Sequence, residues 1–277
     1  MNVRLRIGLL VLHIMVVAQM LSAQTAAHYT TVKDIQYKQG TDAYVRERCK
    51  LDVYYNDSLR NCPVVVWFHG GGLTSGSKQL PQKLRNKGLV IVGVNYRLLP
   101  KVNIDECLDD CAAAVAWAFA NVNHYGGDAR KIFVSGHSAG GYITSMLGLD
   151  KSWLARYGVD ADSIAGLIPL SGQMISHFAY RKMEGIDERR PIVDRYAPLY
   201  HVRKDAPPMV LVTGDRDFEL LGRYEENAYM CRMMKIAGHS DVPLYEISGH
   251  GHNPMLDPAY HIVIESINRI LGRKYAF

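Results

Sequence analysis

Several short stretches of this sequence are apolar at every position, and they constrain the fold more than any other feature. Val64–Phe68 and Met209–Val212 are the clearest examples. A strand that is covered on one face alternates apolar and polar residues, whereas a strand covered on both faces is apolar throughout. The two stretches therefore predict central strands of a sheet that is packed between two layers.

Amphipathic stretches alternate with these apolar runs, as between Ile104 and Val122, where apolar residues recur every three or four positions. We expect eight strands, at residues 31–37, 51–55, 64–68, 89–95, 131–135, 166–170, 209–213 and 244–248. This order predicts an α/β fold, with an antiparallel hairpin followed by a mostly parallel eight-stranded sheet that carries helices on both faces. The composition, 48% hydrophobic and 21% charged, is that of an ordinary globular protein.

The first 23 residues are expected to be a cleaved secretory signal peptide. Arg4 and Arg6 precede an apolar run over residues 7–21 that ends in Ser22-Ala23. A spanning helix needs about 20 apolar residues, so an uncleaved anchor is the less favoured alternative. We expect a secreted or periplasmic protein without a stable membrane anchor, in which residues 24–277 form a single domain. Without Arg4 and Arg6 the formal charge falls from +5 to +3, which is too small to indicate nucleic-acid binding.

Residues 171–208 do not fit the alternation of strands and helices. The segment is rich in charged and aromatic residues, among them Phe178, Tyr180 and Arg181. Plain connections are usually shorter, so we expect a small cap or lid over the sheet edge, with a solvated surface excursion as the alternative. The five cysteines are an odd number spread over a long chain, and we assign no disulfide pair.

An apolar strand runs directly into Gly136-His137-Ser138-Ala139-Gly140 and then into a stretch that favours a helix. This is the strand–turn–helix context of the Gly-x-Ser-x-Gly nucleophile elbow. The two glycines leave room for a sharp turn that strains the serine backbone. Ser138 is therefore the predicted nucleophile.

A glycine-rich segment, His69-Gly70-Gly71-Gly72, follows the apolar strand at 64–68. Glycines let the main chain approach a ligand oxygen and direct N–H groups toward it. We expect the amides of Gly71, Gly72 and Ala139 to form an oxyanion hole, with Gly70 in the turn. A flexible glycine loop without such a role is the alternative.

A serine hydroxyl needs a general base, and the base needs an orienting carboxylate; both are expected after Ser138, with the acid first. For the acid we choose Asp217 over Asp215, because Asp215 directly follows a strand end and fits a turn-forming or capping group. For the base we choose His252 over His250, because His252 lies deeper in its loop.

The other histidines are interpreted as scaffold or rim residues. A metal site at His250 and His252 lacks accompanying carboxylates at ligand spacing. We therefore expect neither a metal nor a cofactor.

Taken together, four segments give the sequence a resemblance to a known family: His69–Gly72, Asn95-Tyr96-Arg97-Leu98, Asp110 with the following Ala113–Trp117, and Gly136–Gly141. The sequence resembles the α/β-hydrolase superfamily in its esterase/lipase branch, near hormone-sensitive-lipase-like carboxylesterases, and is also similar to feruloyl-esterase-like and kynurenine-formamidase-like members. The resemblance spans roughly residues 64–271. It implies the acid at the end of a Gly-x-x-Asp loop and the base in a Gly-x-Gly-His loop, here Asp217 and His252. The large N-terminal helical cap of the lipase branch is missing, so that branch's acyl pocket is not carried over.

The expected function is hydrolysis of carboxylic esters by a Ser138–His252–Asp217 triad through an acyl-enzyme. The substrates considered are acyl groups on carbohydrates, small aromatic esters and short-chain esters. An amidase or peptidase with the same triad is one alternative, and a non-catalytic binding module on a hydrolase fold is another. The sequence carries no information on the oligomeric state.

Overall fold

The structure is a computed structural model that describes residues 28–273. The signal peptide expected at residues 1–23 lies outside these residues and stays a prediction. None of the helices in the described range combines the length and the apolar character that crossing a bilayer requires.

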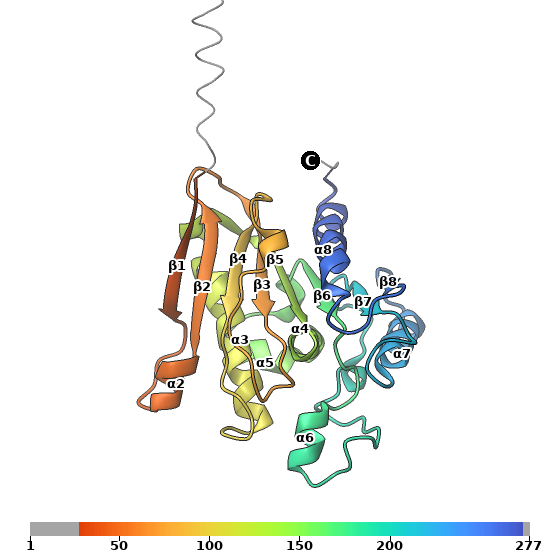
Figure 1. Cartoon of the computed structure of the whole chain (residues 1–277). Helices are drawn as coiled ribbons and strands as arrows, with labels where there is room; N and C mark the ends of the chain where they lie inside the picture. Colours follow the sequence, from red (N-terminus) through yellow and green to blue (C-terminus); the bar gives the residue numbers. More distant parts are fainter. Residues whose placement is uncertain (1–27, 274–277) are drawn as a thin grey trace, which may run out of the picture.

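A single eight-stranded sheet forms the centre of the molecule, and helices pack on both of its faces (Figure 1). The strands are β1 (Tyr29–Gln36), β2 (Lys50–Asn56), β3 (Cys62–Phe68), β4 (Val90–Val94), β5 (Gly127–His137), β6 (Gly166–Leu170), β7 (Leu211–Gly214) and β8 (Leu244–Ile247). The α-helices are α2 (Ala43–Arg48), α3 (Ile104–Asn121), α4 (Ala139–Leu149), α5 (Lys151–Ala155), α6 (Phe178–Met183), α7 (Arg223–Ile236) and α8 (Leu256–Ile270). Short 3-10 turns lie at η1 (Gln82–Leu84), η2 (Val122–Tyr125), η3 (Ala161–Ser163) and η4 (Pro198–His201).

The strand order is β1-β2-β4-β3-β5-β6-β7-β8. Strand β2 is antiparallel to both of its neighbours, β1 and β4. Every pair from β4 to β8 is parallel. The predicted α/β fold, with a mostly parallel sheet and an antiparallel pair at its start, is thus confirmed. Helix α2 between β1 and β2 was not predicted; the Asp42 side chain caps it by accepting a hydrogen bond from the Tyr44 amide (2.9 Å).

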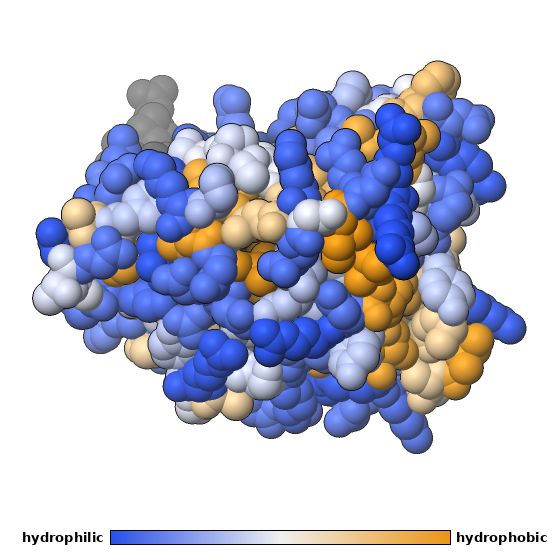
Figure 2. Space-filling model, turned by 90° about the horizontal axis from the view of Figure 1, so that it is seen from below, coloured by the Kyte–Doolittle hydropathy of each residue, from blue (hydrophilic) through white to orange (hydrophobic). Residues whose placement is uncertain are grey.

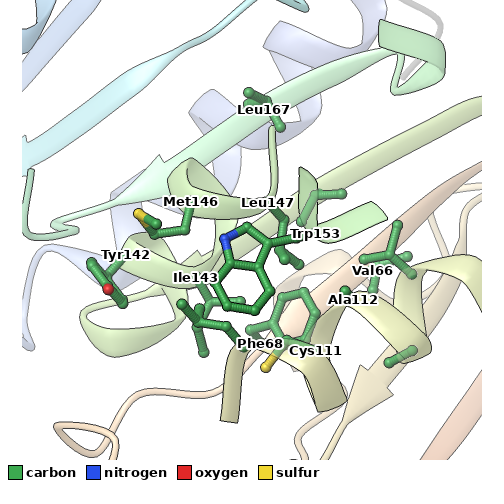
Figure 3. Close-up of a cluster of buried hydrophobic side chains, with 14 of the residues drawn as sticks. Val66, Phe68, Cys111, Ala112, Tyr142, Ile143, Met146, Leu147, Trp153 and Leu167 are labelled. Carbon is green, nitrogen blue, oxygen red and sulfur yellow. The ribbon is translucent and has the colours of Figure 1, made fainter. Parts of the chain in front are cut away.

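Two apolar clusters cover the two faces of the sheet and explain the strands that are apolar throughout. On one face Ile143 of α4 and Trp153 of α5 cluster with Phe68 of β3 (Figure 3). On the other face α8 supplies its apolar side. The adjacent β5 residues Phe133 and Val134 belong to opposite clusters. Every position of such a strand meets a protein layer, so every position is apolar.

A buried ion pair joins the loop after β4 to helix α3. The Asp110 side chain is fully buried and accepts hydrogen bonds from Arg97 Nε (2.7 Å) and Arg97 Nη2 (2.9 Å). Lys38 Nζ donates to Oδ1 of the same carboxylate (2.8 Å). A charge can be buried in this way because hydrogen-bonded counter-charges replace water. The Asn95–Leu98 and Asp110 segments are therefore parts of one structural junction.

The segment 171–208 contains α6 and η4, and α6 lies beyond the carboxyl ends of the parallel strands (Figure 1). Figure 2 views the molecule from that side; apolar surface is exposed in the middle of this face, between strongly hydrophilic borders. Because loops at the carboxyl edge of a parallel sheet commonly form ligand sites, this face is where the predicted site residues are expected to meet.

Candidate active site

A sharp turn joins β5 to α4, and Ser138 occupies it. Its backbone has φ +58° and ψ −115°, a conformation that non-glycine residues rarely adopt. The glycines on either side allow the turn, because a Cβ on Gly136 would lie 2.5 Å from the Phe68 carbonyl oxygen and one on Gly140 would lie closer still. The expected strand–turn–helix is therefore present. Ser138 Oγ has no hydrogen-bond partner among residues 28–273, which leaves the hydroxyl unengaged.

The glycine-rich loop after β3 lies against this turn. A Cβ on Gly70 would come within 3.4 Å of Ser138 Cβ. Gly71 and Gly72 both have positive φ, at +112° and +63°, so the loop depends on glycine at these positions. The amides of Gly71, Gly72 and Ala139 have no hydrogen-bond acceptor within the described chain. Three available donors therefore come from two loops in contact.

His252 is docked on the residue that precedes Ser138. The ring of His137 donates a hydrogen bond from Nε2 to the His252 carbonyl oxygen (2.8 Å), and the two ring centroids are 4.5 Å apart. His252 Nδ1 lies 2.9 Å from Glu219 Oε2. A carboxylate only accepts hydrogen bonds, so Nδ1 carries the proton and Nε2 of the neutral ring is left as an acceptor.

The carboxylate that contacts His252 is Glu219, and the expectation that Asp217 does so is not met. Glu219 is 1% exposed at its side chain, whereas Asp217 is exposed to solvent. The amides of Phe218 and Glu219 both donate to the Asp215 carbonyl oxygen (3.0 and 2.8 Å), which winds this loop into a helical turn. The turn places Asp217 on its outer side and brings Glu219 inward.

Asp215 stabilises this loop, as its position after the strand suggested. Its Oδ1 accepts a hydrogen bond from the Asp217 amide (3.0 Å), and its Oδ2 accepts one from the Gly249 amide (2.6 Å). The loop after β7 is thereby tied to the loop after β8, which carries His252. His250, the alternative base, hydrogen-bonds the Ser248 carbonyl oxygen instead (2.9 Å).

Glu219 accepts four hydrogen bonds and is ionised. Besides His252, the donors are Ser171 Oγ (2.6 Å) and the amides of Gly214 (3.1 Å) and Leu220 (2.9 Å). Burial opposes ionisation, but the hydrogen bonds from His252 and Ser171 outweigh it and lower the pKa of Glu219 to about 2. Glu219 was not predicted from the sequence, although it lies in the same loop, two residues beyond Asp217.

The neighbouring histidines are neutral. Burial lowers the pKa of His137 to about 4, and burial also lowers the pKa of His69 to about 4. The His69 ring stacks on Tyr96, with ring centroids 4.4 Å apart. Both side chains thus pack around the site as uncharged groups.

Two features border the space beside Ser138. The ring of Phe178, at the start of α6, reaches the glycine loop, because a Cβ on Gly72 would lie 2.9 Å from Phe178 Cζ. On another side lies a pocket of about 300 Å³ that Gly70, Gly71 and His137 share with Gln79 and Asn253. The elbow and the glycine loop are therefore flanked by one aromatic wall and by one pocket of mixed lining, to which Trp67 and Leu256 also contribute.

The BD-FAE family model matches residues 51–163, which include the glycine loop and the elbow. Among curated proteins the chain is similar to esterase LipC of Mycobacterium tuberculosis (strain ATCC 25618 / H37Rv), with 27% identity over 251 residues that cover 79% of this chain and 62% of LipC. The matched region spans between half and about three fifths of the first curated relatives.

Solved structures show the same fold. One titled a truncated form of carbohydrate esterase from gut microbiota superimposes with a TM-score of 0.74 at 14% identity, covering 90% of this chain and 99% of that one. Thermogutta terrifontis esterase 2, phosphoramylated by tabun, gives a TM-score of 0.69 at 20% identity, covering 87% of this chain and 94% of that one. With its doubly covered parallel sheet and its sharp turn after β5, this chain shares the fold of these esterase structures.

Proposed function

We propose that this chain is a serine esterase that hydrolyses carboxylic esters through an acyl-enzyme. One observation carries the proposal: His252, whose Nδ1 is held by the buried Glu219 carboxylate, is hydrogen-bonded through its main chain to the residue that precedes Ser138. The three groups then have the roles of nucleophile, base and orienting acid.

Each proposed step follows from these positions. Ser138 Oγ attacks the ester carbonyl carbon while His252 Nε2 accepts its proton. The carbonyl oxygen becomes an oxyanion and accepts hydrogen bonds from the amides of Gly71, Gly72 and Ala139. His252 then protonates the leaving alcohol, and the ionised Glu219 stabilises the imidazolium. Water attacks the acyl-enzyme with His252 again as base, which releases the acid and regenerates Ser138. Catalytic hydrogen bonds in substrate-free enzymes are often long and tighten on binding, which accommodates the unengaged Ser138 hydroxyl.

The substrate class that we propose is an ester of a small acyl group with a carbohydrate. The Phe178 ring beside Gly72 limits the room next to the reacting carbonyl. Gln79 and Asn253 are among the residues that line the adjacent pocket, and side-chain amides are suited to hydrogen-bonding hydroxyl groups. The structural similarity to a protein titled a carbohydrate esterase agrees with this choice.

Replacing the nucleophile tests the proposed function directly. Ser138→Ala should lower kcat on p-nitrophenyl acetate and on an acetylated oligosaccharide by about 10⁶, as removal of a triad nucleophile does. A fluorophosphonate probe should label the wild type and leave the variant unlabelled. Ser77→Ala, an exposed serine on the glycine-loop side, is the matched control and should keep full activity. Activity above about a tenth of wild type in Ser138→Ala would refute the assignment, and faster cleavage of an aminoacyl anilide than of the ester would make the chain an amidase.

Two acidic residues of one loop can be distinguished by paired substitutions. Glu219→Gln keeps the shape of the side chain but removes its charge, and should lower kcat by about 10³–10⁴. Asp217→Asn should keep kcat within about twofold, because this exposed carboxylate stabilises no buried charge. Both are measured as kcat and KM on p-nitrophenyl acetate, with circular dichroism as the check on folding. A larger loss of kcat in Asp217→Asn than in Glu219→Gln would assign the role of orienting acid to Asp217.

Truncating the aromatic wall should widen the range of acyl groups. Phe178→Ala removes the ring beside Gly72, so kcat/KM for p-nitrophenyl octanoate relative to the acetate should rise by at least about tenfold. Tyr200→Ala is the control, because Tyr200 lies in the same segment and is 62% exposed. If the ratio of kcat/KM for the octanoate to that for the acetate is unchanged in Phe178→Ala, the acyl group does not bind beside Phe178.

We also propose export with cleavage after Ala23. When the full chain is expressed in a bacterium and its compartments are separated, the protein should be found outside the cytoplasm with Gln24 as its first residue by N-terminal sequencing. Replacing Arg4 and Arg6 by glutamate should retain the precursor in the cell. An intact N-terminus on the exported or membrane-bound protein would contradict cleavage at this position.

A further inference from the structure

We propose that Ser171 is a positioning residue of this site, which fixes the Glu219 carboxylate and shares the Nδ1 proton of His252. The inference rests on the proposed function, because it requires the Glu219–His252 pair to act during turnover. No sequence motif marks this serine, which directly follows β6.

Ser171, Glu219 and His252 are hydrogen-bonded to one another, and Arg223 Nη1 also donates to Ser171 Oγ (3.5 Å). Ser171 Oγ lies 2.6 Å from Glu219 Oε1 and 2.9 Å from His252 Nδ1, while Glu219 Oε2 lies 2.9 Å from the same nitrogen. The ionised carboxylate only accepts, so the serine hydroxyl donates its proton to Oε1. The serine oxygen keeps its lone pairs, and the Nδ1–H of His252 is shared between that oxygen and Oε2.

The backbone of Ser171 is held in a strained conformation that fixes this geometry. Its φ is +48°, in the left-handed region that non-glycine residues seldom occupy, and the residue is completely buried. Its amide donates to the Val212 carbonyl oxygen (2.7 Å). Strain of this kind persists where surrounding contacts determine the conformation, and it concentrates at functional sites.

Helix α7 supplies those contacts from one of its faces. The buried Arg223 donates from Nη1 to the Ser171 carbonyl oxygen, and Asn227 donates from Nδ2 to the Gly172 carbonyl oxygen (2.9 Å). Glu226 Oε2 accepts a hydrogen bond from the Met174 amide (2.8 Å). Residues three and four apart on a helix share a face, so a single face of α7 holds the main chain on which Ser171 is mounted.

Losing the Ser171 hydroxyl should affect the transition state more than substrate binding. Without the Ser171 hydroxyl, Glu219 Oε1 would keep only the hydrogen bond from the Gly214 amide, so the carboxylate would be held less firmly in its orientation toward His252. The positive charge on His252 exists only while a proton is in transfer. A group that orients its counter-charge therefore acts on kcat, while KM is set by contacts that are already made in the ground state.

The first test is Ser171→Ala, assayed on p-nitrophenyl acetate. We expect kcat to fall by about 10- to 100-fold and KM to stay within about twofold. Ser176→Ala is the matched control, since Ser176 is equally buried in the same segment and donates to a carboxylate, Asp194 Oδ1 (2.7 Å), away from His252. The control should keep kcat. Wild-type kcat in Ser171→Ala, or an equal loss in the control, would overturn the proposal.

The second test asks whether Ser171 acts through Glu219. In the Glu219→Gln background, adding Ser171→Ala should cost less than about twofold, because the interaction it supports is already lost. A second full loss in that background would mean an independent structural effect and would overturn the proposal. Ser171→Cys keeps a side chain of similar size with a weaker donor, so it should give a kcat between those of the wild type and Ser171→Ala. This variant replaces Ser171→Ala if the alanine variant fails to fold. Full activity of Ser171→Cys would also contradict the positioning role.

The two proposals fail in different ways. Wild-type turnover in both Ser138→Ala and Glu219→Gln would refute the esterase mechanism, and the role of Ser171 with it. Loss of activity in those two variants together with a fully active Ser171→Ala would refute the positioning role alone.

Discussion

The main chain at the end of β3 touches the nucleophile elbow with no side chain between them, and the geometry of the site depends on that contact. The Phe68 carbonyl oxygen occupies the space where Gly136 and Gly140 would carry a Cβ. Any larger residue there would push the glycine loop away from Ser138. Since the proposed oxyanion donors come from both sides of this contact, the distance between them is set by backbone packing, which side-chain motions cannot relax.

The ionisable groups around His252 differ in charge. Glu219 is a buried carboxylate whose pKa of about 2 keeps it negative at all ordinary pH values. The two buried imidazoles nearby, His69 and His137, have pKa values of about 4 and stay neutral. A positive charge that forms on His252 thus meets one fixed counter-charge and no competing cation from these rings. Environments that push the pKa values of neighbouring groups apart assign them different roles.

The sheet and the elbow could be predicted from the sequence, because both require particular residue types at particular positions. Strands buried on both faces require apolar residues at every position, and close main-chain approach requires glycine, so Val64–Phe68 and Gly136 are visible in the sequence. Asp217 was expected to contact His252, whereas Glu219 does, because the two residues share one loop and only the turn built on the Asp215 carbonyl decides which of them faces inward. Ser171 was missed because its left-handed backbone and its partners are set by tertiary contacts that no local pattern encodes.

The segment after β6 contributes to two separate properties in the proposed mechanism, the orientation of Glu219 and the room for the acyl group. Ser171 at its start contacts the Glu219–His252 pair, and Phe178 a few residues later borders the space beside Gly72. Gln173 Oε1 accepts the Phe178 amide hydrogen bond (3.0 Å), so a shift of α6 would pull on the chain that carries Ser171. The hydrogen bonds from α7 to residues 171, 172 and 174 lie between these two points and resist such a shift. In the proposed mechanism, a substitution in α6 could therefore change which acyl groups fit beside Gly72 without changing the orientation of Glu219. One segment can thus contribute both to substrate selection and to the orientation of the acid.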